Sequence, residues 1–236
     1  MTDLINLILD ENRYLHDDIY NNLWVTSVNP DTNLVSERFW YPVSSTQSRF
    51  QFNSKTSSID DSVSYERGYI YLKENNLPIR DSQYLKSFEF ILSCRIWPLQ
   101  HGMLLHAGYN KTNPLDYCFY LWVDAMTDTS FNLGIWSKDD TYGATLNCTG
   151  LSIYPPANGY QWMTIKVLGD GEKMTLSIVE YPQYGEVSIP FSMYNVKGGI
   201  NLGQTPNNSE ALGCAARCDF LQLKGSYYSE NILKVY

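Results

Sequence analysis

A stretch of strict alternation decides the fold: Ser87-Phe-Glu-Phe-Ile-Leu-Ser-Cys-Arg-Ile-Trp-Pro98. Successive side chains of a β-strand point to opposite faces of the sheet, so every second residue shares a face. One face of this stretch is wholly apolar and consists of Phe88, Phe90, Leu92, Cys94 and Ile96. The other face is mixed and consists of Glu89, Ile91, Ser93, Arg95 and Trp97. The pattern predicts a strand over 87–97 with one face turned to a core.

The same alternation recurs along most of the chain. Strands are predicted at 34–41, 49–52, 69–72, 87–97, 103–109, 117–124, 131–137, 161–168, 173–180, 199–203 and 218–224. Proline, glycine and asparagine separate them, and Asp170-Gly171 between two alternating runs indicates a hairpin. Many short strands with regular turn residues predict an all-β protein built as a two-sheet antiparallel sandwich.

Several of these strands resemble the laminin-G-like, concanavalin A-like jelly rolls. Ser87 to Pro98 resembles a strand of that superfamily that ends in Trp and a turn. Phe119-Tyr-Leu-Trp-Val-Asp124 and Phe131-Asn-Leu-Gly-Ile-Trp136 are similar to its next two strands. Gly159-Tyr-Gln-Trp162 and the Gly169-Asp-Gly171 hairpin, followed by closing strands at 200–203 and 218–224, extend the resemblance over about residues 48–225. The resemblance implies a jelly-roll topology.

Calcium is a second implication, because some members of that superfamily bind it through loop acids. The candidate ligands are Asp124, Asp128, Asp139 and Asp140. Calcium takes several oxygen ligands, and no spacing here is diagnostic, so solvated loop acids are the alternative. No cofactor is therefore predicted, and calcium stays open.

The outward face of the strands predicts a recognition surface. It combines aromatic rings with charged and amide groups at Arg95, Tyr120, Trp122, Asp124, Asn132 and Trp136. Sugars are bound by such sets, because rings stack on apolar sugar faces while carboxylates and amides bond the hydroxyls. The alternative is that loops fold over this face and turn its aromatic residues into a second small core.

The N-terminal residues predict a different element. Apolar residues at roughly helical spacing favour a helix over residues 3–23, closed by the turn residues Asn29-Pro30-Asp31. The predicted organisation is a helical anchoring segment at 1–33 and a sandwich at 34–236. The pattern leaves open whether the helix docks on its own sandwich or on a partner.

Composition narrows the partners and the compartment. The formal net charge of −8 disfavours nucleic acid and anionic membrane surfaces. No stretch approaches the roughly 20 apolar residues of a membrane helix, and the first residues lack the features of a secretory signal, which predicts synthesis in a cytoplasm.

The odd count of 5 Cys argues against a disulfide framework. Cys94 and Cys118 are predicted to be buried, and the sequence falls short of a zinc ligand set.

Catalytic signatures do not appear in the sequence. Sandwich glycosidases need two carboxylates that divide the acid and nucleophile roles, whereas the strand acids Glu89, Asp124, Glu180 and Asp219 stand singly. We therefore predict that the chain is not an enzyme. A glycan-processing hydrolase and a purely structural spacer remain as alternatives.

A binding module without a secretory signal predicts a component of a particle that is assembled inside a host. The hypothesis is a bacteriophage virion protein with a structural and adhesive role, which binds glycan or a neighbouring virion protein. Oligomerisation is expected as well, because particles repeat their components.

Overall fold

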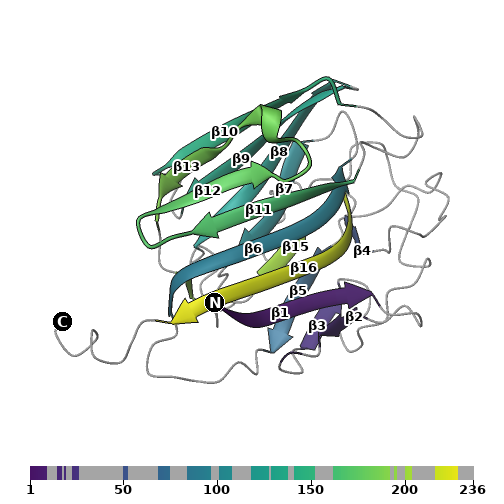
Figure 1. Ribbon diagram of the computed structural model, residues 1–236. Coiled ribbons are helices and arrows are strands. Elements are labelled where there is room, and N and C mark those ends of the chain that lie inside the picture. The colour runs from purple at the N-terminus through teal and green to yellow at the C-terminus, as the bar shows by residue number, and fades with distance from the viewer. Residues whose placement is uncertain are drawn as a thin grey trace.

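The computed structural model is a sandwich of two facing β-sheets (Figure 1). It describes residues 1–9, 15–17, 19, 23–26, 50–52, 69–74, 84–96, 101–107, 118–127, 129–137, 141–151, 162–191, 194–195, 200–203 and 216–227. In this part of the chain no helix is long and apolar enough to span a membrane. The predicted all-β sandwich is confirmed.

One sheet has nine strands. They are β1 (Thr2–Leu9), β2 (Leu15–Asp17), β4 (Phe50–Phe52), β6 (Tyr84–Ile96), β11 (Met163–Gly169), β12 (Lys173–Ile178), β13 (Val187–Pro190), β14 (Tyr194–Asn195) and β16 (Ala216–Tyr227). The order is β13-β12-β11-β6-β16-β1-β2, with β14 paired to β6 and β4 paired to β16. The β16–β4 pair is parallel and the other pairs in this sheet are antiparallel.

The second sheet has seven strands and lies behind the first in Figure 1. They are β3 (Leu23–Thr26), β5 (Tyr69–Glu74), β7 (His101–Ala107), β8 (Phe119–Thr127), β9 (Ser130–Ser137), β10 (Gly143–Thr149) and β15 (Ile200–Gly203). The order is β10-β9-β8-β7-β15-β5-β3, and every pair is antiparallel. At the β10 edge, β13 and the short helix η3 (Pro182–Tyr184) approach from the other sheet, and the Tyr184 hydroxyl donates to the Thr149 carbonyl at 2.6 Å.

The core lies between the sheets and follows the predicted alternation. Along β11, buried residues alternate with half-buried ones at every position. Phe119 of β8 reaches across the interface, and its ring centroid lies 5.9 Å from that of Phe88 and 6.0 Å from that of Phe90, both on β6. All three side chains are fully buried. Cys94 and Cys118 are buried in this layer, as predicted.

The predicted N-terminal helix is wrong. Residues Thr2–Leu9 form β1, which pairs antiparallel with β16 in the nine-stranded sheet. The register shifts between Asp3 and Ile5, and this irregularity lets both Leu4 and Ile5 be buried. Two adjacent buried residues break the period of two and produce an apparent helical spacing in the sequence. Residues 2–9 form a strand and not a helix because the edge of β16 provides hydrogen-bond partners for their backbone. An anchoring role for residues 1–33 stays a prediction.

Other strand predictions differ in their outcome. The strand predicted at 49–52 is β4, whereas the one predicted at 34–41 lies outside the described residues. Besides the N-terminal strands β1, β2 and β3, the two-residue strand β14 and the longer strands β10 and β13 were not predicted. We consider β10 and β13 here. Both are outer strands of their sheets and are rich in Gly, Thr, Ser, Asn or Pro, which have weak strand signals.

The predicted hairpin at Asp170-Gly171 is confirmed and joins β11 to β12. Gly171 has a φ of 99°, a conformation that favours glycine. The Asp170 carboxylate accepts hydrogen bonds from the backbone N–H groups of Lys173 and Glu172, each at 2.9 Å. These bonds lower the pKa of Asp170 below its ordinary value of 3.8.

The lowered pKa of Asp170 predicts an acid-dependent contribution to stability. A group with a depressed folded pKa stabilises the fold fully above its unfolded pKa and loses that contribution as the pH falls through the folded pKa. Asp170→Ala should therefore lower the melting temperature at neutral pH, and the difference from wild type should shrink in acid. Thermal melts over an acid titration measure this. Asp170→Asn is the control, because it keeps an acceptor oxygen without a titrating group; a wild-type–alanine difference that is constant in acid contradicts the assignment.

Candidate functional site

The outer face of the seven-stranded sheet carries five of the six predicted binding residues in neighbouring positions. Backbone register pairs Tyr120 with Trp136 and Asp124 with Asn132, while Trp122 lies opposite Gly134. Strand β10 extends the same face by placing Thr145 beside Gly134 and Asn147 beside Asn132. We call this set the aromatic face; it consists of Tyr120, Trp122, Asp124, Asn132, Trp136, Thr145 and Asn147.

The Trp136 indole packs against the backbone of two glycines, Gly134 and Gly143, which we call the glycine seat. Register pairs Gly143 with Trp136, and a Cβ added to Gly143 would meet the indole ring, 2.7 Å from Cδ2. A Cβ on Gly134 would lie 2.8 Å from Nε1 of the same indole. The indole therefore covers backbone that carries no side chains. Its plane is within 11° of the Tyr120 ring, with the ring centroids 6.4 Å apart. Two near-parallel rings, both half-buried, thus present a continuous aromatic surface.

Gly143→Ala tests this seat. In wild type the new methyl group should push the indole away, at a cost of about 1–3 kcal/mol in the free energy of unfolding. In a Trp136→Ala background the same substitution should be neutral or stabilising, because alanine in a strand avoids the entropic cost of glycine. Denaturant unfolding of the four proteins gives the coupling energy directly. Equal effects of Gly143→Ala in both backgrounds contradict the seat.

Exposure changes along the face. At one end His106 of β7 is buried beside Tyr120, with the ring centroids 5.8 Å apart. Desolvation by burial lowers the pKa of His106 to about 4, so the imidazole is neutral at physiological pH. Tyr120, Trp122, Asn132 and Trp136 are half-buried, and Asp124 at the other end is exposed. His106 was not among the predicted site residues, because its position next to Tyr120 depends on the pairing of β7 with β8.

Arg95 does not join the other five predicted residues. It lies in β6, in the nine-stranded sheet, where register places it opposite Arg217 of β16. The aromatic face is built by β8, β9 and β10 of the other sheet. The sequence pattern identified outward positions on each strand but carried no information about which sheet each strand enters, and this is why Arg95 was grouped with the rest.

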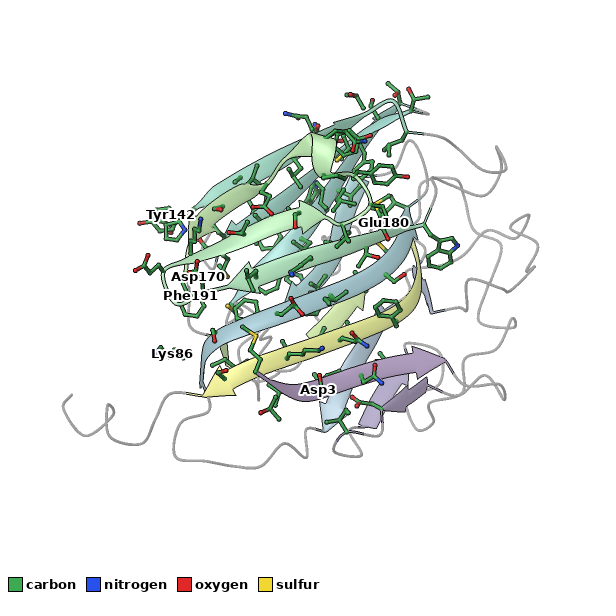
Figure 2. All side chains as sticks on the ribbon, in the orientation of Figure 1. Asp3, Lys86, Tyr142, Asp170, Glu180 and Phe191 are labelled. Atoms are coloured by element: carbon green, nitrogen blue, oxygen red, sulfur yellow. The ribbon has the colours of Figure 1, made fainter. Side chains whose placement is uncertain are left out.

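The outer face of the nine-stranded sheet has a different character. Its polar groups bond each other: Lys166 pairs with Glu89 at 2.6 Å, Lys224 with Asp3 at 3.6 Å, and the Gln222 amide donates to Asn6 at 3.0 Å. Next to these, Glu180 accepts a hydrogen bond from the Thr164 hydroxyl at 2.6 Å. Figure 2 labels Asp3 and Glu180 on this side of the molecule. Cross-strand pairing of this kind is typical of a solvated sheet surface.

The Asp124 carboxylate of the aromatic face is not paired in this way. Among the described residues, none forms an ion pair or side-chain hydrogen bond with the Asp124 carboxylate. The calcium candidates Asp128, Asp139 and Asp140 lie outside the described residues, and the described part of the chain contains no group of three or more His, Cys, Asp or Glu side chains that could hold a metal. The face is therefore an aromatic surface with an exposed carboxylate and two amides along one side.

Comparison with known proteins supports the fold. No protein-family model and no curated protein matches this chain. Among solved structures, one concerned with the interaction of botulinum neurotoxin type C with two ganglioside molecules has a TM-score of 0.52 at 12% identity, over 99% of this chain and 50% of that one. A structure described as HCR/D-Sa-GBL1/C gives 0.53 at 12% identity, over 99% and 51%. Domains of the mouse laminin α1 chain give 0.36 at 14% identity, over 66% and 40%.

The chain thus spans about half the length of the two structures that match it over nearly its whole length. At this identity the likeness concerns the fold alone. The strand arrangement and the two matches with TM-scores above 0.5 support the predicted two-sheet jelly-roll sandwich.

Proposed function

We propose that the chain is a non-catalytic glycan-binding module and that the aromatic face is its binding surface. One observation carries the proposal: the two outer faces of the same sandwich differ. On the nine-stranded sheet the polar side chains bond each other, whereas on the seven-stranded sheet half-buried aromatic rings adjoin a carboxylate without a described partner. A surface that only faces solvent accounts for the paired polar groups of the nine-stranded sheet. It does not account for the half-buried aromatic rings beside a carboxylate on the seven-stranded sheet.

The chemistry of the face fits a sugar. A pyranose has an apolar face that packs on an aromatic ring and hydroxyl groups that both donate and accept hydrogen bonds. Trp136 and Tyr120 supply near-parallel rings, and Asp124, Asn132 and Asn147 form one cross-strand row of acceptors and donors beside them. The glycine seat holds the Trp136 indole in place before a ligand arrives, which reduces the entropic cost of binding.

One of the structural matches bears on this proposal. The toxin structure concerns an interaction with ganglioside molecules, and this chain covers 50% of it. A glycan ligand for the present chain is compatible with that likeness.

The absence of catalysis is part of the proposal. Hydrolysis of a glycosidic bond needs two carboxyl groups, about 5–9.5 Å apart, that divide the acid and nucleophile or base roles. Asp124 is the single carboxylate among the described residues of β7, β8, β9 and β10. The hydrolase alternative predicts release of reducing sugar from a bound glycan, and loss of that release in Asp124→Asn. We expect no release from the wild-type protein.

The virion setting is a further part of the proposal and comes from the sequence alone. A glycan-binding module on a bacteriophage particle serves for attachment, and its repetition in the particle turns weak single-site binding into avidity. Co-sedimentation of the protein with purified particles, together with its native mass, tests this. A monomer that is absent from particles contradicts the setting without contradicting glycan binding.

A glycan microarray followed by calorimetric titration tests the binding function. Wild type should bind at least one oligosaccharide, and the double variant Trp122→Ala/Trp136→Ala should lose that binding while keeping its circular dichroism spectrum. The matched control is Gln222→Ala, which changes an outward residue of the other sheet and should bind as wild type does. If the double variant unfolds and the wild type binds no glycan, the face is a second core and the chain is a spacer.

A further inference from the structure

The charge of the aromatic face points to the class of glycan it takes. Its single charged side chain among the described residues is Asp124, which is exposed. The described residues between 101 and 151 contain no Lys and no Arg. His106, at the buried end of the face, has a lowered pKa and adds no positive charge near neutral pH. The described part of this face therefore holds a negative charge without a compensating cation.

The lysines whose side chains are described lie on the other sheet, and Lys73 lies in β5, which β7 and β15 separate from β8. Lys166 and Lys224 are on the outer face of the nine-stranded sheet and are paired there with Glu89 and Asp3. Lys86 and Lys173 are on the same sheet and are exposed. The chain as a whole carries a formal net charge of −8, so its long-range field also repels anions. Local and overall charge thus act in the same direction.

We infer that the aromatic face selects neutral oligosaccharides and discriminates against sialylated, sulfated and uronate-containing ones. This inference rests on the proposed glycan-binding function. A neutral sugar can donate hydroxyl hydrogens to the Asp124 carboxylate, and charge-assisted hydrogen bonds of this kind are the stronger ones. An acidic sugar brings a second anion to a site that provides no described cation, and like charges placed together in an interface weaken binding.

Matched pairs of glycans test this selection. The probes are lactose and sialyllactose, N-acetyllactosamine and its sulfated form, and mannan and alginate. For the pairs in which either member binds, wild type should prefer the neutral member by about tenfold or more, which corresponds to about 1.4 kcal/mol. Raising the salt concentration should bring the affinities for the neutral and acidic members closer together, because salt screens the repulsion between Asp124 and the acidic sugar.

Two variants separate the local charge from the overall charge. Asp124→Asn should narrow the preference by raising affinity for the acidic members, while its affinity for the neutral members stays level or falls a few-fold. Asp3→Asn changes the net charge by the same amount but lies on the other sheet, beside Lys224 at 3.6 Å, so the ratio of neutral to acidic affinities should stay as in wild type.

The outcomes distinguish the two proposals. If the acidic members bind as well as or better than the neutral ones and Trp136→Ala abolishes that binding, the selection is wrong and the glycan-binding function stands. An unchanged ratio in Asp124→Asn likewise overturns the role of Asp124. If the wild type binds neither member of any pair nor any glycan on the array, the binding function itself fails.

Discussion

Replacement of Phe119 by alanine is expected to lower the free energy of unfolding by about 3–5 kcal/mol, a large share of the stability of a typical domain. Phe119 is fully buried and stands between the sheets, with its ring parallel to Phe88 within 2° and edge-on to Phe90. Its removal leaves a cavity at the contact between β8 and β6, and close-packed neighbours collapse into such a cavity only partly. Denaturant unfolding followed by circular dichroism measures the loss.

Phe119→Leu is the control for the size of the cavity. Leucine keeps the site apolar and fills more of its volume, so this variant should lose less than Phe119→Ala does. The slope of the unfolding free energy against denaturant should stay the same in both variants if they unfold as wild type does. A loss below about 1 kcal/mol in Phe119→Ala is the value for an ordinary surface position and contradicts the central place of this residue.

Trp136→Ala is expected to weaken glycan binding by at least about 30-fold, equivalent to about 2 kcal/mol, the value that marks a hot spot. Trp136 is the ring of the aromatic face that the glycine seat fixes, and it lies next to Tyr120, so its loss removes both stacking area and order. Calorimetric titration with the best glycan from the array gives the change in affinity.

Trp136→Phe separates stacking from the specific shape of indole. Phenylalanine keeps a flat ring over the glycines, so binding should fall less than in Trp136→Ala. The fold should persist in both variants, because the wild-type indole is only half-buried. If Trp136→Ala loses as much stability as Phe119→Ala and binds the glycan normally, the indole is a core residue and the binding surface lies elsewhere.

The sequence was informative wherever one strand could be considered alone. The alternation in 87–97, 117–124 and 131–137 predicted which residues face the core, and the buried Phe88, Phe119 and Leu133 follow it. Alternation depends on a local property of extended backbone and needs no knowledge of partners. The same property identified five neighbouring members of the aromatic face.

The sequence-based predictions were wrong where the structure of a segment depends on the strand with which it pairs. Thr2–Leu9 is a strand because it pairs with the edge of β16. The register irregularity beside Ile5 interrupts the alternation of buried and exposed residues that would otherwise indicate a strand. Arg95 was grouped with the residues of β8 and β9, but its strand β6 belongs to the other sheet. The seat of Trp136 requires Gly143 from a strand that the sequence pattern did not reveal. Long-range pairing of this kind has no local signature in a single sequence.

Adjacent residues on one strand provide the most direct measurement of the whole account. Phe119 is predicted to stabilise the packing of the two sheets, and Tyr120, the next residue, to contact the glycan. Unfolding free energy and glycan affinity are measured for Phe119→Ala and Tyr120→Ala. We expect a large loss of stability in Phe119→Ala, and a large loss of glycan affinity with little change in stability in Tyr120→Ala. Similar losses of stability in both variants, with glycan affinity unchanged in Tyr120→Ala, would contradict it.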